Sequence, residues 1–344
     1  MPWALVLSDG KPGHENQSLG ILPKGVEGRV LRIAYRSKPA RLRAWLAARF
    51  PAVSGLLMGR FPWGGIITDS DRLNDCLAEP PVVVLSSGSG PAPMTLHIAH
   101  HFKTPAITCM TPSVGLSHFD LALVPRHDNP PAEANIVTTL GAPNRVEPAR
   151  LAVEGEAFKQ HHNLTGKGYI CLLLGGDSAH HAIPPETGVA ILNACVELAE
   201  THGFDLLVTT SRRTREETET AMYRLHDQCA YFCRGRIDSE PVMQGMLALA
   251  DLVLVTEDSV SMVSEAASCP ARVVALRVPI AGNRPPRRHE AVLSALADGG
   301  YAARADVPEL GSVATALLSA PAPPMLDDTT RCRAAVSQLL DTAS

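Results

Sequence analysis

One stretch of this sequence, residues 250–276, sets the strongest limit on what the chain can fold into. It opens with the apolar run 252–255 between polar residues, which is typical of a buried strand in a parallel sheet. A polar turn follows, in which Ser259 or Ser261 can cap a helix whose apolar residues recur at helical spacing. A second apolar run at 273–276 comes after that helix. The stretch therefore predicts a strand, a polar loop, a helix and a second strand.

The same order recurs along the whole chain. We expect strands at 3–7, 81–85, 105–109, 119–124, 170–174 and 204–208, with loops and helices between them. Strands that alternate with helices form parallel sheets covered by helices on both faces. The polar segment 150–166 has little strand character and separates two such sets. We therefore expect an α/β protein with two Rossmann-like, doubly wound domains that face a cleft. The expected boundaries are 1–150, 167–320 and a last helix at 325–344 that returns to the N-terminal domain.

Composition excludes several classes of protein. A length of 344 residues suits two domains of ordinary size, and a net charge of −4 gives no reason to expect nucleic-acid binding. No apolar run approaches the ~18 residues of a membrane span. The eight cysteines are scattered, so we expect reduced thiols, a cytoplasmic protein and no structural zinc site. Three histidines on one expected helix, His97, His100 and His101, do not by themselves make a metal site.

Small and polar residues follow several expected strands, at the edge where open α/β sheets bind ligands. The helix that begins near Ser259 would offer N–H groups and a partial positive charge to a phosphate. Glu265, about two turns further along, could accept both hydroxyls of a ribose. The alternative is an ordinary strand–helix–strand unit with a serine-rich cap.

A loop with two glycines and a proline follows the first expected strand, at 8–17. It matches neither a Walker A loop nor a dinucleotide fingerprint. His14 is expected just before the next helix, where it could act as a general base near neutral pH. A solvated surface histidine is the alternative. A second loop of small residues, 86–91, follows the strand at 81–85.

The stretch 250–276 resembles the nucleotide-sugar-binding unit of GT-B glycosyltransferases, especially the N-acetylglucosaminyl transferase of peptidoglycan synthesis. Ala250-Asp251, Ser264-Glu265 and Pro270 match its pattern, in which the glutamate contacts the ribose. Gly13-His14 matches the end of the glycine loop in the same enzymes. The chain departs from the pattern where Asp258-Ser259 replace the usual loop glycine. The step from Glu265 to Pro270 is also one residue short.

Taken together, the motifs closely resemble the elongated-mitochondria family of mitochondrial fission over nearly the whole chain. The motifs that carry this likeness are Ser8–Gln17, Ser87-Gly88, Pro125–Asp128, Gly175–Ser178, Thr210–Thr214 and Thr256–Met262. Bacterial members of that family are often labelled predicted nucleoside-diphosphate-sugar epimerases. The family name comes from a plant member that recruits a dynamin-related protein to mitochondria.

These resemblances imply two functions, and the sequence leaves both open. The first is a GT-B glycosyltransferase, or an epimerase on the same fold, acting on a nucleoside-diphosphate sugar that is UDP-linked, with no metal or other cofactor. The second is a recruitment protein that binds nucleotide without turnover; a dehydrogenase is a weaker third. On the first, His14 is the catalytic base, and the expected substrate-binding residues are Gly13, Gly88, Ser89, Gly175, Gly176, Asp177, Ser178, Arg212, Arg213, Asp258, Ser259, Ser261 and Glu265.

The segment 24–60 carries nine basic residues and one acid. Residues 41–50 are expected to form a helix with Leu42, Trp45, Leu46 and Phe50 on its apolar side. Basic and aromatic residues together suit an anionic membrane surface, so peripheral membrane binding is predicted through Arg41, Arg43, Trp45 and Arg49. The alternative is a core-facing helix with a solvated arginine face.

Overall fold

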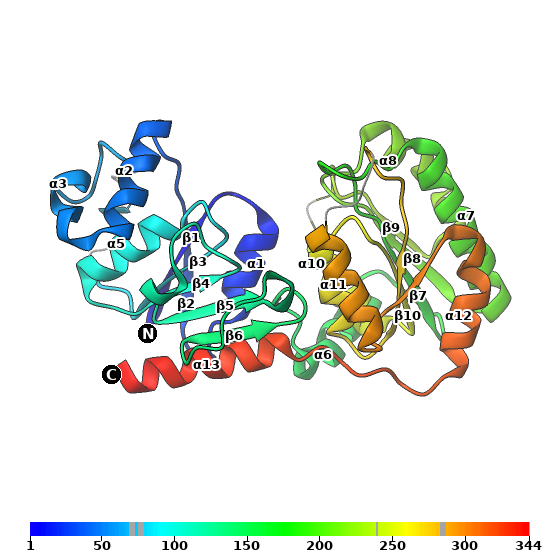
Figure 1. The fold of residues 1–344 in the computed structure, drawn as a ribbon. Coiled ribbons are helices and arrows are strands. Elements are labelled where there is room, and N and C mark those ends of the chain that lie inside the picture. The colour runs from blue at the N-terminus through cyan, green and yellow to red at the C-terminus, as the bar shows by residue number, and fades with distance from the viewer. Residues whose placement is uncertain (69–72, 75–78, 239, 283–286, 344) are drawn as a thin grey trace. The chain divides into compact units, whose positions relative to one another are not determined.

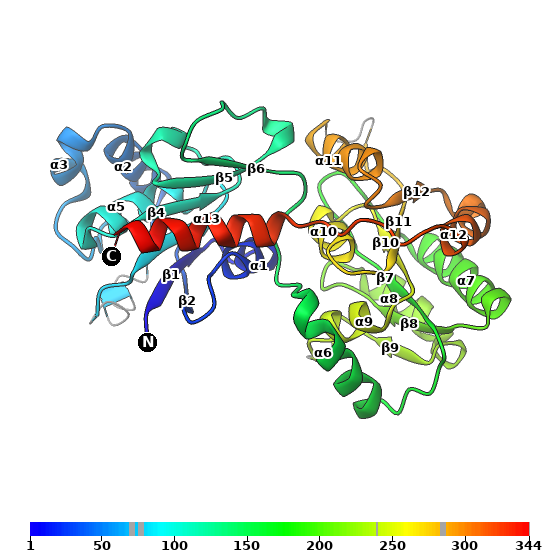
Figure 2. The same ribbon diagram turned by 90° about the horizontal axis from the view of Figure 1, so that it is seen from below.

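The computed structural model describes residues 1–68, 73–74, 79–238, 240–282 and 287–343. The chain divides into two compact units, which we call unit 1 (Met1–Arg145 with Asp327–Ser344) and unit 2 (Val146–Leu326). Each unit holds a six-stranded parallel sheet flanked by helices (Figures 1 and 2). The α/β fold class with two Rossmann-like domains is therefore confirmed.

The sheet of unit 1 has the strand order β2-β1-β3-β4-β5-β6. Its strands are β1 (Trp3–Ser8), β2 (Glu27–Arg32), β3 (Val83–Ser87), β4 (Ala106–Cys109), β5 (Leu121–Pro125) and β6 (Ile136–Thr139). Its longer helices are α1 (Pro12–Gly20), α2 (Lys38–Arg49), α3 (Ser54–Met58), α5 (Ala92–Phe102) and α13 (Asp328–Ala343). Since β1 is buried along its whole length, its alternate residues face two cores. Leu5 and Leu7 join the core beside α2 and α5, whereas Ala4 and Val6 join the one beside α1 and α13.

The last helix, α13, is fixed to unit 1 by polar contacts at its first turn. The Asp328 carboxylate accepts hydrogen bonds from the backbone N–H groups of Leu140 (2.8 Å) and Gly141 (2.7 Å). The hydroxyl of Thr329 accepts the N–H of Asn144 at 2.9 Å. One turn further, the Arg333 guanidinium donates to the carbonyl of Gly20 at 2.8 Å. A carboxylate at a helix N-terminus is also favoured by the helix dipole.

The sheet of unit 2 has the order β12-β11-β10-β7-β8-β9. Its strands are β7 (Tyr169–Leu173), β8 (Asp205–Thr209), β9 (Tyr231–Cys233), β10 (Leu252–Thr256), β11 (Arg272–Leu276) and β12 (Ala303–Ala305). Its helices are α6 (Pro148–His161), α7 (Pro185–His202), α8 (Glu216–Tyr223), α9 (Met243–Leu249), α10 (Val260–Ala267), α11 (Arg287–Asp298) and α12 (Leu310–Ser319). The central strands β7 and β10 are buried along their whole length, as the apolar runs predicted.

Each sheet has one point at which the strand order reverses. In unit 1 the chain winds outward from β1 to β2 and then restarts at β3 on the other side of β1. In unit 2 it winds from β7 through β8 to β9 and then restarts at β10, on the other side of β7. Ligands of open α/β sheets bind beyond the carboxyl ends of the strands at such a switch point. The loops after β1 and β3, and those after β7 and β10, are therefore the places to look for sites.

Three sequence predictions about local structure are wrong. His14 lies inside α1 rather than before it, because Pro12, with its fixed φ and missing N–H, starts the helix two residues earlier. Ser86 and Ser87 belong to β3 rather than to a loop. Their hydroxyls are buried but paired, with Thr95 (2.7 Å) and Ser18 (2.9 Å) respectively.

The third wrong prediction concerns the apolar side of α2. Its buried residues are Ala40, Ala44, Ala47 and Ala48, while Leu42 is 55% exposed and the adjoining Phe50 is 53% exposed. Small side chains let α2 lie close against its neighbours, so Leu42 and Phe50 are not on its inner face, whereas Trp45 packs against the core.

Seven cysteines are free thiols in the part of the chain that the structure describes, and Cys76 lies outside it. None of the described helices has the length and apolar character needed to cross a membrane.

Candidate functional site

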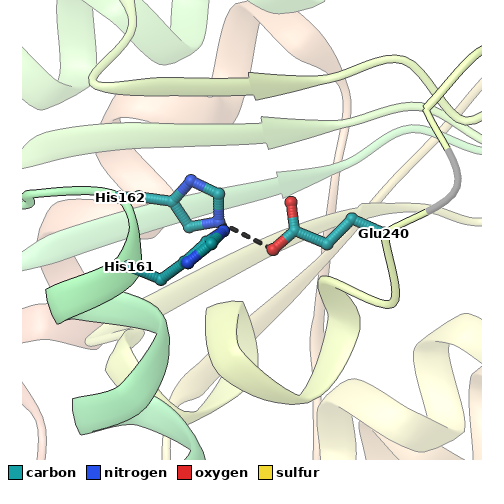
Figure 3. A group of neighbouring side chains, drawn as sticks. All are labelled: His161, His162 and Glu240. Atoms are coloured by element: carbon teal, nitrogen blue, oxygen red, sulfur yellow. Dashed lines mark hydrogen bonds and ion pairs between the residues drawn. The ribbon is translucent and has the colours of Figure 1, made fainter.

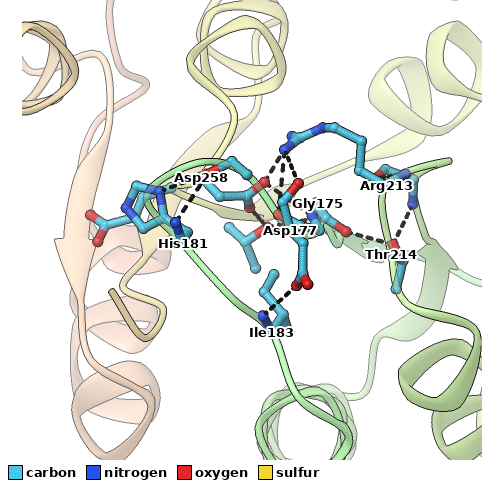
Figure 4. A network of polar contacts seen from close by, with 12 residues as sticks. Gly175, Asp177, His181, Ile183, Arg213, Thr214 and Asp258 are labelled. Atoms are coloured by element: carbon cyan, nitrogen blue, oxygen red, sulfur yellow. Dashed lines mark hydrogen bonds and ion pairs between the residues drawn. The ribbon is translucent and has the colours of Figure 1, made fainter. Parts of the chain in front are cut away.

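At the switch point of unit 2, the loops that follow β7, β8 and β10 are joined by a polar network (Figure 4). The N–H of Gly175, just after β7, donates to the hydroxyl of Thr256 at the end of β10 (2.7 Å). The hydroxyl of Thr214, in the loop after β8, donates to the carbonyl of Gly175 (2.5 Å). The sequence places these three loops far apart, and the sheet brings them to one edge.

The carboxylate of Asp258 is the centre of this network. Its side chain is fully buried, and it pairs with the guanidinium of Arg213 at 2.8 Å. It also accepts the N–H of Gly176 at 3.0 Å and the hydroxyl of Thr256 at 2.7 Å. A cation, a backbone N–H and a hydroxyl are the donors that would hold a phosphate oxygen, and here the protein's own carboxylate occupies them.

The glycine after β7 is required by this close approach. A Cβ at Gly175 would lie 2.2 Å from the Asp258 carboxylate. Any other residue would push Asp258 out of the loop and separate the ends of β7 and β10. The departure from the GT-B pattern at Asp258 is thus matched by a glycine on the facing loop.

Three arginines lie in the loop after β8, and they differ in their hydrogen bonds and ion pairs. Arg213 also donates to the carbonyls of Gly176 (3.3 Å) and Asp177 (3.1 Å). Arg215 pairs with the Asp177 carboxylate. Arg212 is exposed, and within the described part of the chain its side chain has neither a hydrogen bond nor an ion pair. Of the expected diphosphate ligands, Arg212 is therefore the cation that an anion can reach without breaking an existing pair.

The remaining loop residues after β7 hold the loop itself. The Asp177 carboxylate accepts the N–H of Ile183 at 3.1 Å, and the Ser178 hydroxyl accepts the N–H of His181 at 3.0 Å. These contacts fold the segment back on itself. They occupy side-chain atoms that the sequence analysis assigned to a ligand.

Helix α10 begins beside this network. Ser259 is its N-cap residue, although its side chain makes no cap hydrogen bond, and Ser261 lies half-buried in the first turn. The first N–H groups of any helix lack an intrahelical partner, so this turn presents donors at the switch point. Glu265 lies further along α10 and is 8% exposed. Arg272, an alternative partner for Glu265, instead donates to the carbonyls of Leu317 and Ala320.

The switch point of unit 1 holds a histidine–carboxylate pair. His14 Nδ1 lies 3.0 Å from Asp9 Oδ1; His14 is half-buried and Asp9 is an exposed residue. When Nδ1 donates to the carboxylate, Nε2 is left as the proton acceptor. Sequence analysis missed Asp9; the available signal was a carboxylate directly after a strand, five residues before the histidine.

The surroundings of the pair favour a neutral imidazole. Burial lowers the pKa of His14 below its ordinary value and nearby Lys11 acts in the same direction, while the charge of Asp9 opposes both. Burial alone would raise the pKa of Asp9, but a hydrogen bond from Lys11 and the charge of His14 hold it below its ordinary value. The pair therefore consists of a carboxylate and an imidazole whose pKa values are both lowered.

The loop after β3 contacts this pair. Gly88 has a φ of +83°, and a Cβ there would lie 2.8 Å from His14 Cε1. The backbone thus approaches the imidazole where only glycine fits. Ser89 follows and accepts the Ser113 hydroxyl at its carbonyl (2.8 Å), and Gly13 lies beside His14 in the first turn of α1. His14, Gly13, Gly88 and Ser89 therefore gather in unit 1, whereas the other expected site residues lie in unit 2.

The residues predicted to bind a membrane differ in exposure and in hydrogen bonding. Arg41 and Arg49 are exposed on α2. Trp45 is half-buried and its indole N–H donates to the carbonyl of Ser113 at 2.7 Å. Arg43 is exposed, but its guanidinium donates to the carbonyl of Leu57 at 2.6 Å. Leu56 on α3 is an apolar residue that is more exposed than Trp45, at 85%.

Comparison with known proteins gives both a family and a fold. The model of the family described as "Mitochondrial fission ELM1" matches residues 12–340. No curated protein sequence matches the chain.

Solved structures of similar fold include the UDP-GlcNAc 2-epimerase from Methanocaldococcus jannaschii, with 12% identity, a TM-score of 0.59, and coverage of 99% of this chain and 100% of that one. The UDP-GlcNAc 2-epimerase from Neisseria meningitidis, bound to UDP-GlcNAc, has 14% identity, a TM-score of 0.55 and coverage of 99% of each chain. The glycosyltransferase SnogD from Streptomyces nogalater has 12% identity, a TM-score of 0.50 and coverage of 99% and 97%. At these identities the likeness establishes a GT-B-like fold.

Proposed function

This chain belongs to the mitochondrial fission ELM1 family, and we propose that it binds a nucleoside-diphosphate sugar, UDP-linked, and acts on it as a glycosyltransferase or a related nucleotide-sugar-processing enzyme. The observation that carries the proposal is the set of loops after β7, β8 and β10. They meet at the switch point of unit 2, beside the first turn of α10.

Electrostatics at this edge suits a diphosphate. The first turn of α10 supplies N–H groups and a partial positive charge, and Arg212 supplies a full charge without a competing partner among the described residues. These groups could stabilise a leaving diphosphate without a metal ion. The bound UDP-GlcNAc of the Neisseria epimerase, which shares the fold, supports the choice of ligand.

Glu265 is the proposed ribose ligand. It lies on α10 beyond the turn that is proposed to face the diphosphate, and this order along the helix supports a carboxylate that meets the ribose. A carboxylate oxygen that accepts a ribose hydroxyl makes a charge-assisted hydrogen bond.

His14 is the proposed general base. With Asp9 orienting its ring and burial keeping it neutral, Nε2 could remove a proton from an acceptor hydroxyl. Lys11, paired with Asp9 at 3.1 Å, limits how strongly the carboxylate raises the basicity of the imidazole.

A second candidate function is recruitment of a protein partner without turnover. One observation favours it: the buried Asp258 carboxylate already occupies Arg213 and the N–H of Gly176. A phosphate at the same donors would have to displace that carboxylate. A protein that retains the fold but has lost catalysis could keep such a filled site.

A ligand screen followed by a turnover assay tests the proposal. UDP, UDP-GlcNAc and other nucleotide sugars are added to the protein, and unfolding is followed by thermal shift. Ligand at a hundredfold excess over Kd stabilises by about 2.7 kcal/mol. Stabilisation by UDP compounds together with release of UDP or an epimerised sugar supports the enzyme. Stabilisation without product in any acceptor mixture favours the recruiter, and no stabilisation by any nucleotide contradicts both.

A further inference from the structure

Two histidines and a glutamate gather in unit 2 (Figure 3). Among the residues that the structure describes, His161, His162 and Glu240 are the group whose potential metal-ligand atoms all lie within 4.8 Å of one another. His161 ends α6 and His162 is its C-cap residue, while Glu240 precedes α9. The group therefore joins two segments that are 78 residues apart in the sequence.

Neighbouring rings hold His162 in place. Its imidazole centroid lies 4.4 Å from the ring of Phe158 and 4.3 Å from that of Tyr231. Its Nε2 atom points at Glu240 Oε1, 2.8 Å away. The other carboxylate oxygen of Glu240 accepts the hydroxyl of Tyr231 at 3.0 Å. One imidazole and the carboxylate are thus oriented by contacts on their far sides, as metal ligands commonly are.

We propose that His161, His162 and Glu240 form a binding site for a divalent transition-metal ion, with Zn²⁺ as the best-fitting ion. Two imidazole nitrogens and one carboxylate oxygen are a donor set that zinc accepts, with a fourth position left for water. The second imidazole is available because His161 is exposed at the end of the helix, with its ring edge-on to His162 at 4.7 Å.

Binding requires a small contraction of the group. Ligand atoms around a tetrahedral zinc ion lie about 3.3 Å apart, which follows from bond lengths of about 2.0–2.1 Å. The present spread of up to 4.8 Å can close by rotation of His161 and Glu240, which are exposed, while His162 stays between its two rings. The hydrogen bond between His162 and Glu240 is replaced by two bonds to the ion.

Charge favours a cation here. Glu240 supplies the carboxylate of the group. The imidazole of His162 lies 2.8 Å from this carboxylate. A bound divalent ion would meet this carboxylate and two imidazole rings, and in the described part of the chain no arginine or lysine pairs with the glutamate.

Calorimetric titration of the full chain with ZnCl₂ at pH 7.5 tests the site, using H161A, E240Q and the matched control H202A. His202 likewise ends a helix, α7. In the described part of the chain, the one hydrogen bond of its side chain is with Thr315. Wild type and H202A should bind one zinc per chain with equal affinity. H161A and E240Q should each bind at least about tenfold more weakly, since losing even an outer-shell partner costs about 10–100-fold.

Cobalt(II) gives a second readout, because its visible absorption reports the coordination geometry and the ligand set. The wild-type spectrum should indicate four-coordinate cobalt, and E240Q should lose it while its far-UV circular dichroism stays unchanged. Zinc affinity that is equal in wild type, H161A and E240Q overturns the proposal, as does wild-type binding no tighter than that of H161A. UDP affinity measured with and without a chelator separates this site from the proposed function, and it should not change.

Discussion

The pair of Asp258 and Arg213 gives the sharpest prediction about how the loops of unit 2 are held. Replacing Asp258 with asparagine keeps the shape of the side chain and removes its charge. The amide oxygen can still accept from Gly176 and Arg213, which lie 3.0 Å and 2.8 Å away. The amide nitrogen then faces Thr256, whose hydroxyl donates to the carboxylate in the native protein at 2.7 Å.

This change in hydrogen bonding lowers the free energy of unfolding. One charge-assisted hydrogen bond becomes neutral and one buried hydroxyl loses its acceptor, which together cost about 2–3 kcal/mol. Arg213 itself adds little to the cost, because its side chain is 41% exposed and keeps its two carbonyl partners. For a domain of this size the change corresponds to a fall in Tm of roughly 4–12 °C. Asp258→Ala removes all three contacts and should cost about 3–5 kcal/mol.

Differential scanning calorimetry and urea unfolding measure both variants, with Asp227→Asn as the control. Asp227 is exposed in a short turn after α8, and its replacement should change the free energy of unfolding by less than about 0.5 kcal/mol. If Asp258→Asn unfolds within that margin of wild type, the carboxylate does not hold the loops together. The interpretation of the filled anion site would then be wrong.

Three further predictions concern charge. Arg212→Ala should weaken UDP binding about 10–100-fold in calorimetry without lowering Tm, because the side chain is exposed and has neither a hydrogen bond nor an ion pair in the described part of the chain; an unchanged Kd contradicts its role. In an NMR titration His14 should show a pKa below its ordinary value, and Asp9→Asn should lower it further, since the carboxylate raises it; a rise in Asp9→Asn reverses the argument. Because the pKa of His14 is depressed in the folded state, its contribution to stability is present above the ordinary pKa. This contribution is lost as pH falls through the folded-state pKa. Vesicles containing phosphatidylglycerol should bind the chain at low salt. The double variant Arg41→Glu with Arg49→Glu should weaken flotation by at least about tenfold, since each basic residue contributes about 1 kcal/mol to binding. Flotation that does not change with salt or in this variant counts against membrane binding.

Much of the architecture was predictable because it depends on local patterns. Most of the expected strands are apolar runs followed by a small or polar residue. The strands of the structure that correspond to them begin and end within two residues of those runs, whereas β2, β9 and β12 were not predicted. Ser259 and Ser261 were the two expected helix caps, and Ser259 is the N-cap residue of α10, although its side chain makes no cap hydrogen bond. The two-domain α/β class followed from the alternation of strands and helices.

The parts that could not be predicted depend on partners distant in the sequence. Ser86 and Ser87 look like a loop until Thr95 and Ser18 are seen to pair with their hydroxyls. The strand order, and with it the two switch points, requires the sheet. Asp258 lies 45 residues from Arg213, so the pairing of this expected phosphate ligand with a carboxylate could not be predicted from local patterns.

The group at His161, His162 and Glu240 escaped notice for the same reason. Adjacent histidines at the end of an expected linker helix have no ligand spacing of their own. The third side chain lies on a segment 78 residues away, and α6 and α9 bring it near.

The most direct test of the proposed function is the affinity of Glu265→Ala for UDP, measured by calorimetry beside wild type and the exposed control Glu217→Ala. If Glu265 accepts the ribose hydroxyls, its loss should weaken binding about tenfold to a hundredfold, because a hydrogen bond to a charged group contributes about 1.5–3 kcal/mol. Wild type should bind 2′,3′-dideoxy-UDP about as poorly as the variant binds UDP, and the variant should not distinguish the two nucleotides. A variant that still prefers the ribonucleotide as strongly as wild type would show that Glu265 does not bind ribose, and would contradict nucleotide-sugar binding at α10.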